Sequence, residues 1–162
     1  MGNLIGKSVK RVEDQRFITG KGQYTDDIVL PGMTYATIIR SPLAHANIKN
    51  VDFSAAKNAP GYVASFVGSD IPEGIAGVPC AWQVDFKNGD TMNEPPHPLL
   101  ARGKVRYVGD AVAVVIAETQ AQAKDAAAMV DLEYEELPAV VDIDEALKEG
   151  APQLHDEAPN NY

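Results

Sequence analysis

The sequence predicts an α+β fold in which a mixed sheet packs against helices. Short runs of apolar and β-branched residues alternate with turn formers along most of the chain, as is typical of strands. One continuous apolar run, residues 111–117, indicates a strand that is buried on both faces. An amphipathic helical pattern follows it at once, and then another alternating run. This order of strand, helix and strand indicates a mixed α+β domain.

The distribution of apolar residues divides the chain into an N-terminal arm, residues 1–30, and a single domain, residues 31–162. The arm is polar, rich in turn formers and ends at the turn signal Leu30-Pro31-Gly32. Its apolar residues are too sparse to form a core of their own. We therefore expect the arm to lie on another surface.

The first strands of the domain are predicted from three β-branched and aromatic runs: residues 33–40, 46–53 and 62–67. The first run ends at Ser41-Pro42, where the chain should turn. Between the second and third runs, Ser54 offers a helix N-cap, so we expect a turn or two of helix that must end by Pro60.

Residues 68–101 are rich in glycine, proline, Asp and Asn, which predicts irregular connections over the surface. Within this stretch, residues 82–86 alternate in polarity and lead into Asn88-Gly89, a pair that favours a tight hairpin turn. We interpret the stretch as an insertion or extended loop, not as a linker between domains.

The clearest pattern runs from residue 104 to residue 130. Residues 104–108 and 111–117 are predicted strands. Thr119-x-x-Gln122 is a capping box that opens a helix. The helix has one apolar face, made of Ala123, Ala126, Ala127 and Val130. We expect this face to pack on the sheet.

The C-terminal part of the domain contains one more strand and one short helix. Residues 130–134 alternate in polarity as a half-exposed strand does. Asp142-x-x-Glu145 is a second capping box, and the helix that it opens should end by Gly150.

The charge of the chain argues against nucleic acid and membranes as partners. The formal net charge is −9, with 8 Lys and Arg against 5 Asp and Glu in residues 1–57, and 6 against 18 in residues 58–162. An acidic surface repels phosphate backbones and anionic lipids. No apolar run approaches the roughly 18 residues that span a bilayer, and residues 1–7 lack the apolar region of a secretory signal. We therefore expect a soluble cytoplasmic protein whose acidic half either serves solubility or docks a partner.

Motifs with a catalytic or metal-binding spacing are hard to find. The three histidines, His45, His97 and His155, lie about fifty residues apart and are expected to be surface or turn residues. No glycine-rich nucleotide loop is present, and the single cysteine, Cys80, cannot form an internal disulfide.

The segment that begins at Arg40 and Ser41 and reaches His45 is the strongest candidate for recognition. It places a cation, a hydroxyl and an imidazole at the end of an apolar strand, where recognition residues are common. The alternative is that Ser-Pro simply turns the chain and Arg40 binds backbone carbonyl groups.

Several motifs together resemble the start of a known family of large subunits. They are Arg11-Val12-Glu13-Asp14, Arg16-Phe17, Thr19-Gly20-Lys21-Gly22, Tyr24-x-Asp26-Asp27-Ile28, Arg40-Ser41-Pro42, Ala44-His45-Ala46, Val108-Gly109-Asp110-Ala111, Leu137-Pro138-Ala139 and Gly150-Ala151-Pro152. In this order they resemble the large subunits of carbon-monoxide-dehydrogenase-like molybdenum hydroxylases. Xanthine dehydrogenases and aldehyde oxidases are the wider relatives. Gln15 departs from the family, whose members usually carry proline at this place.

The resemblance implies the N-terminal α/β hammerhead domain, a scaffold beside the molybdopterin-binding core that helps to seat the iron–sulfur subunit. It implies no catalytic, cofactor or metal residue on this chain. The complete enzyme would use molybdopterin cytosine dinucleotide, with 2Fe-2S clusters and FAD on partner subunits. Partners would be the remainder of the large subunit, the iron–sulfur subunit and the flavin subunit. The candidate interface residues are Arg16, Phe17, Arg40, Ser41 and His45.

Further expectations concern the extent and the activity of the chain. We expect a fragment of a longer large subunit, or a naturally split one, whose substrate the sequence does not reveal. Two alternatives remain: a free-standing acidic protein-binding module, and a small hydrolase that uses Ser41 and His45 with Asp110.

Overall fold

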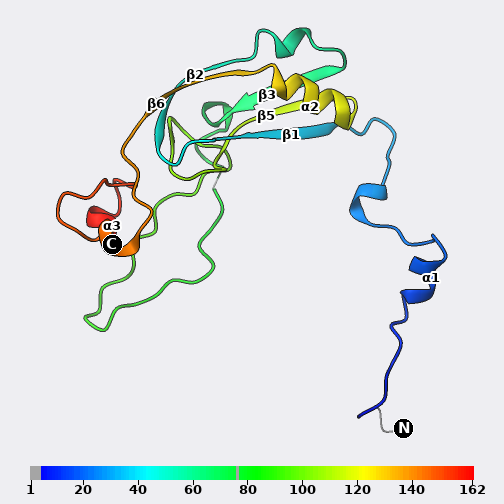
Figure 1. Ribbon diagram of the computed structural model, residues 1–162, viewed down its shortest axis with the longest axis horizontal. Coiled ribbons are helices and arrows are strands. Elements are labelled where there is room, and N and C mark those ends of the chain that lie inside the picture. Colours follow the sequence, from blue (N-terminus) through cyan, green and yellow to red (C-terminus); the bar gives the residue numbers. More distant parts are fainter. Residues whose placement is uncertain (1–4, 76) are drawn as a thin grey trace. The chain divides into compact units, whose positions relative to one another are not determined.

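The computed structural model describes residues 5–75 and 77–162, which form parts of two units (Figure 1). The first unit ends at Met33 and the second is Thr34–Tyr162. The first contains helix α1 (Asp14–Ile18) and a 3₁₀ turn (Thr25–Asp27). The division into an arm of residues 1–30 and one domain stays a prediction.

The first sheet of the second unit has the order β1-β5-β3, and both pairings are antiparallel. Its strands are β1 (Tyr35–Arg40), β5 (Ala111–Ala117) and β3 (Tyr62–Val67). β5 is central, which explains its continuous apolar sequence, because a central strand has neighbours on both edges and packing on both faces. The strand predicted from residues 111–117 is confirmed, but its two faces differ in burial. Ala113, Val115 and Ala117 are buried on one face, whereas Val114 and Ile116 on the other are only half-buried.

The second sheet has the order β4-β2-β6 and is also antiparallel. Its strands are β4 (Lys104–Val105), β2 (Ala46–Asp52) and β6 (Asp131–Glu136). The described residues therefore form two antiparallel sheets, whereas the sequence analysis expected a mixed one. The reason is the path of the chain: after β5 and the helix that follows, β6 pairs with β2 in the other sheet, so no parallel neighbour is created.

Helix α2 (Gln120–Ala128) packs on one face of the first sheet (Figure 1). The Thr119 side chain accepts a hydrogen bond from the backbone N–H of Gln122, as the capping box predicts. Ala126 of this helix is fully buried against Val115 of β5 and Ala56. Small residues on the helix allow this close approach to the sheet.

A second apolar cluster lies by the second sheet and includes Ala46, Ala101, Val105 and Val112. Val112 belongs to β5, the central strand of the first sheet. One strand therefore contributes to the cores of both sheets.

One local expectation is corrected by the structure and another is confirmed. Ser54 does not cap a helix: its backbone N–H donates to Asp52 Oδ1 over 2.8 Å, and the 3₁₀ turn that follows is Ala56–Asn58. The short C-terminal helix α3 (Ile143–Ala146) follows its predicted cap, Asp142, and ends before Gly150 as expected.

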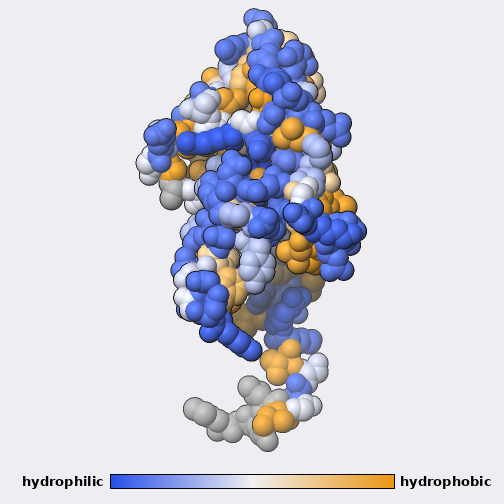
Figure 2. Space-filling model, turned by 90° about the vertical axis from the view of Figure 1, so that its left-hand side faces the viewer, coloured by the Kyte–Doolittle hydropathy of each residue, from blue (hydrophilic) through white to orange (hydrophobic). Residues whose placement is uncertain are grey.

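The connecting stretch after β3 is irregular as expected, with a 3₁₀ turn at Gly68–Asp70 and one isolated bridge between Asp85 and Thr91 around the predicted hairpin turn. Within residues 5–75 and 77–162, no helix has the length and apolar character needed to cross a bilayer. Figure 2 shows one side of the protein, on which hydrophilic residues dominate and apolar residues lie in small groups.

Candidate functional site

The corner between β1 and β2 carries three of the predicted interface residues. Here the chain leaves the first sheet and enters the second. The Ser41 backbone N–H donates to Asp110 O over 2.9 Å, and Ser41 O accepts from the Gly109 N–H over 2.8 Å. The Ser41 hydroxyl donates to Leu43 O over 2.9 Å and accepts from the Leu43 N–H over 3.0 Å. Ser41 is 3% exposed, so its hydroxyl builds the turn from inside.

His45 ties this corner to the segment after β6. Its ring is 5% exposed, and Nδ1 lies 2.7 Å from Pro138 O. A carbonyl oxygen only accepts, so Nδ1 must carry the proton. The Leu137 N–H also donates to His45 O over 2.9 Å. The buried Nε2 has no partner among the described residues. His45 lies in a turn as predicted, but inside the domain and not on its surface.

Arg40 is exposed and donates from Nη1 to Gly109 O over 2.8 Å. This is the alternative considered above, in which Arg40 satisfies a backbone carbonyl. The contact uses one guanidinium nitrogen and fixes the side chain beside the Gly109-Asp110 turn. Gly109 has a φ of +94°, which glycine tolerates and other residues rarely adopt.

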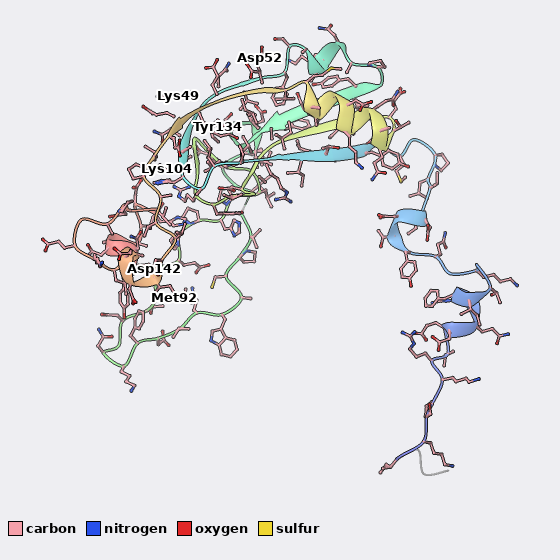
Figure 3. The ribbon with its side chains drawn as sticks, in the orientation of Figure 1. Lys49, Asp52, Met92, Lys104, Tyr134 and Asp142 are labelled. Atoms are coloured by element: carbon pink, nitrogen blue, oxygen red, sulfur yellow. The ribbon has the colours of Figure 1, made fainter. Side chains whose placement is uncertain are left out.

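Two tyrosines next to this corner were not identified from the sequence, and both lie near the Asp110 carboxylate. Asp110 Oδ2 accepts the Arg106 N–H over 3.1 Å. Burial raises the pKa of the Tyr107 hydroxyl, and the Asp110 carboxylate raises it further. Burial also raises the pKa of Tyr134 on β6, although the Ser41 hydroxyl works against this shift (Figure 3). Both tyrosines therefore stay protonated at neutral pH and are poor bases.

The corner does not form a hydrolytic triad. In the described residues no hydrogen bond joins Ser41 to His45, because the Ser41 hydroxyl is bound to Leu43 and His45 Nδ1 faces Pro138. A serine nucleophile needs an adjacent base to remove its proton. The geometry gives no support to the hydrolase alternative.

Arg16 and Phe17 lie on α1 in the first unit. The Phe17 ring stacks on Tyr24 with 5.3 Å between centroids, and the Arg16 guanidinium lies 5.2 Å from the Phe17 ring centroid. The Arg16 side chain is exposed and Phe17 is half-buried. The assignment of these two residues, and of the three corner residues, to a subunit interface stays a prediction.

The residues that the structure describes do not fit a metal ion or an iron–sulfur cluster. Over the described ranges, no three His, Cys, Asp or Glu side chains gather in a way that could hold a metal ion. Iron–sulfur clusters are usually held by four ligands, most of them cysteine thiolates. The sequence contains one cysteine, Cys80, which is exposed.

Comparison with known proteins identifies the family. A family model described as aldehyde oxidase and xanthine dehydrogenase, a/b hammerhead domain, matches residues 19–138. The chain belongs to this family. The hammerhead domain expected from the sequence motifs is thereby confirmed, and the two antiparallel sheets with α2 are its fold in this chain.

Relatives of this hammerhead domain are parts of much longer proteins. It is 41% identical over 159 residues to the nicotine 6-hydroxylase large subunit of Paenarthrobacter nicotinovorans, covering 98% of this chain and 19% of that protein. It is 38% identical over 154 residues to the carbon monoxide dehydrogenase large chain of Afipia carboxidovorans, covering 94% and 18%. The structure of quinoline 2-oxidoreductase from Pseudomonas putida 86 matches with a TM-score of 0.81 and 43% identity, covering 96% and 19%. The chain spans about a fifth of the length of these relatives.

Proposed function

We propose that this hammerhead domain is the structural and subunit-docking part of a molybdenum-hydroxylase large subunit and carries no catalytic residue of its own. The observation that carries the proposal is an apolar face of the first sheet that α2 leaves open.

The strand register defines this open face. α2 covers the side of the sheet that holds Val115. Residues that alternate with it point to the other side, because neighbouring side chains in a strand lie on opposite faces. The pairings place six apolar residues there: Ala36, Ile38, Ala64, Phe66, Val114 and Ile116. Together they define the open face.

The open face exposes large side chains at its centre. Ile38 and Phe66 are paired to the same residue of β5, Val114, and are 47% and 43% exposed. Covering what they expose would remove about 150 Å² of apolar surface from water, worth roughly 4 kcal/mol at about 25 cal/mol per Å². Large apolar side chains that lie side by side and are partly exposed suit a docking surface.

The remainder of a large subunit is the occupant that best fits the open face. Relatives of this chain are about five times as long as the chain itself. The resemblance places molybdopterin cytosine dinucleotide in that remainder, and the 2Fe-2S clusters and FAD on the iron–sulfur and flavin subunits, in the cytoplasm. In this assembly the hammerhead domain binds the neighbouring parts of the enzyme, and the substrate is hydroxylated outside this domain.

A binding experiment tests this proposal. The chain would be titrated with the separately expressed remainder of a related large subunit, such as that of nicotine 6-hydroxylase. We expect binding at micromolar concentration that Ile38→Asp and Phe66→Asp each weaken at least tenfold. Val141→Asp is the matched control, since Val141 is 93% exposed and lies outside both sheets.

Two results would contradict the proposal: the absence of binding by the unaltered chain, or equal weakening by all three variants. Circular dichroism of each variant verifies that the sheets are intact. Repeating the titration at high ionic strength distinguishes docking through the open face from docking through an acidic surface. Contacts between exposed charges weaken at high ionic strength, whereas apolar contacts persist.

A further inference from the structure

A small pocket next to the Gly109-Asp110 turn gathers positive charge in the acidic half of the chain. Its volume is about 200 Å³, and prolines of residues 95–98 form one wall. Lys104 and Arg106 line it, and they are two of only six Lys and Arg residues in residues 58–162, where Asp and Glu number 18. Their presence together runs against the charge of the surrounding sequence.

The cations of this pocket are available to a ligand. Arg106 donates from Nε to Leu154 O over 2.7 Å, which fixes the plane of its guanidinium group. No described residue accepts a hydrogen bond from its two terminal nitrogens, and Lys104 forms no ion pair within the described ranges. Lys104 lies on β4 and is labelled in Figure 3. The one carboxylate in the wall, Asp110, already accepts the backbone N–H of Arg106.

Two histidines add further hydrogen-bonding groups. His155 Nδ1 is buried and has no partner among the described residues. Burial and the Arg106 charge lower the pKa of His155, while Glu157 and Asp156 oppose the shift. On the proline wall, His97 Nε2 lies 3.4 Å from Tyr107 Oη. An anion in the pocket would supply both the missing partner of His155 and a counter-charge for Arg106.

We propose that this pocket binds a phosphate group, held by Arg106 and Lys104 and hydrogen-bonded by His155. The planar fork of an arginine and the point charge of a lysine are the usual ligands of phosphate oxygens. The pocket, at about 200 Å³, is large enough for a phosphate group, and its proline wall is rigid because proline fixes its own backbone. Inorganic phosphate and a small phosphate monoester are the two sources of this chemistry.

The test is a titration of the full 162-residue chain with inorganic phosphate and, separately, with glycerol 3-phosphate, at constant ionic strength. NMR of the histidine ring protons reports on the site directly. We expect saturable shifts of the His155 signals and a rise of the His155 pKa in the complex. Tighter binding of the ester identifies an organic phosphate as the ligand, and equal binding identifies recognition of the phosphate group alone.

Charge-matched variants decide the outcome. Lys104→Gln should weaken phosphate binding at least tenfold, and Arg106→Gln should abolish it. Lys124→Gln removes the same charge from the exposed surface of α2 and should leave binding unchanged. Arg106 also holds Leu154, so Lys104→Gln is the variant that keeps the test independent of folding. Non-saturable shifts, or equal affinity in Lys104→Gln and Lys124→Gln, would overturn the proposal.

Discussion

Replacing Val115 by alanine is the most direct test of which face of the first sheet α2 covers. Val115 is fully buried between the first sheet and α2, in contact with Ala56 and Ala126. The substitution removes two buried carbon atoms, worth about 1.6 kcal/mol at ~0.8 kcal/mol each. A residual cavity of about 30 Å³ adds ~0.7 kcal/mol. The free energy of unfolding should therefore fall by about 2 kcal/mol.

Val114→Ala is the matched control on the same strand. The substitution is again valine to alanine, but Val114 is half-buried and lies on the open face, opposite α2. Val114→Ala should lower the free energy of unfolding by less than about 1 kcal/mol. Its side chain is already partly exposed, so its truncation removes less buried surface and leaves no closed cavity.

Urea unfolding followed by far-ultraviolet circular dichroism measures both variants, with the slope of the transition as a check on the unfolded state. We expect a clear difference between the two midpoints. A larger loss for Val114→Ala would show that the faces of β5 are assigned the wrong way round, and equal losses would show that both faces are buried alike. Either result would refute both the definition of the open face and its proposed docking role.

Three further predictions concern single positions. Gly68→Ala should lower the free energy of unfolding by roughly 1–3 kcal/mol, since a Cβ there would overlap backbone carbonyl oxygens, whereas Gly74→Ala, with open space, should be nearly neutral in thermal melts. Thr119→Ala removes the cap of α2 and should cost about 1 kcal/mol by urea titration; an unchanged midpoint would contradict the capping geometry. The pKa of His155 lies below its ordinary value of 6.5, so as the pH falls the unfolded chain takes up a proton at this residue before the folded domain does. The free energy of unfolding should therefore fall as the pH drops below about 6.5, and it should fall less steeply in His155→Gln. Urea titrations at a series of pH values measure this difference.

Local signals made much of the fold predictable. Residues 111–117 form a central strand because seven small and β-branched residues in succession suit burial on both faces, and the Thr119 cap marks where α2 begins. These features depend on neighbours within a few positions. The Ser54 prediction was wrong because Asp52, two residues earlier, binds Ser54 instead.

Pairings between distant segments could not be predicted in the same way. Nothing within β6 specifies that it pairs with β2, some eighty residues earlier, instead of joining β5. The corner behaves similarly: Arg40 and Ser41 were recognised from their composition, but their partners Gly109 and Asp110 come from a turn about seventy residues away. Their proposed interface role stays a prediction.

Val112 and Val115, three residues apart on β5, have consequences for how the domain loses its structure. The first lies in the core of the second sheet and the second in the core under α2. Unfolding of either sheet displaces β5, which packs in the core of the other sheet as well. Neither sheet can therefore unfold by itself at a low cost in free energy. Amide protons of β2 and β3 should therefore exchange with solvent through one shared global opening, and the two sheets behave as a single cooperative folding unit.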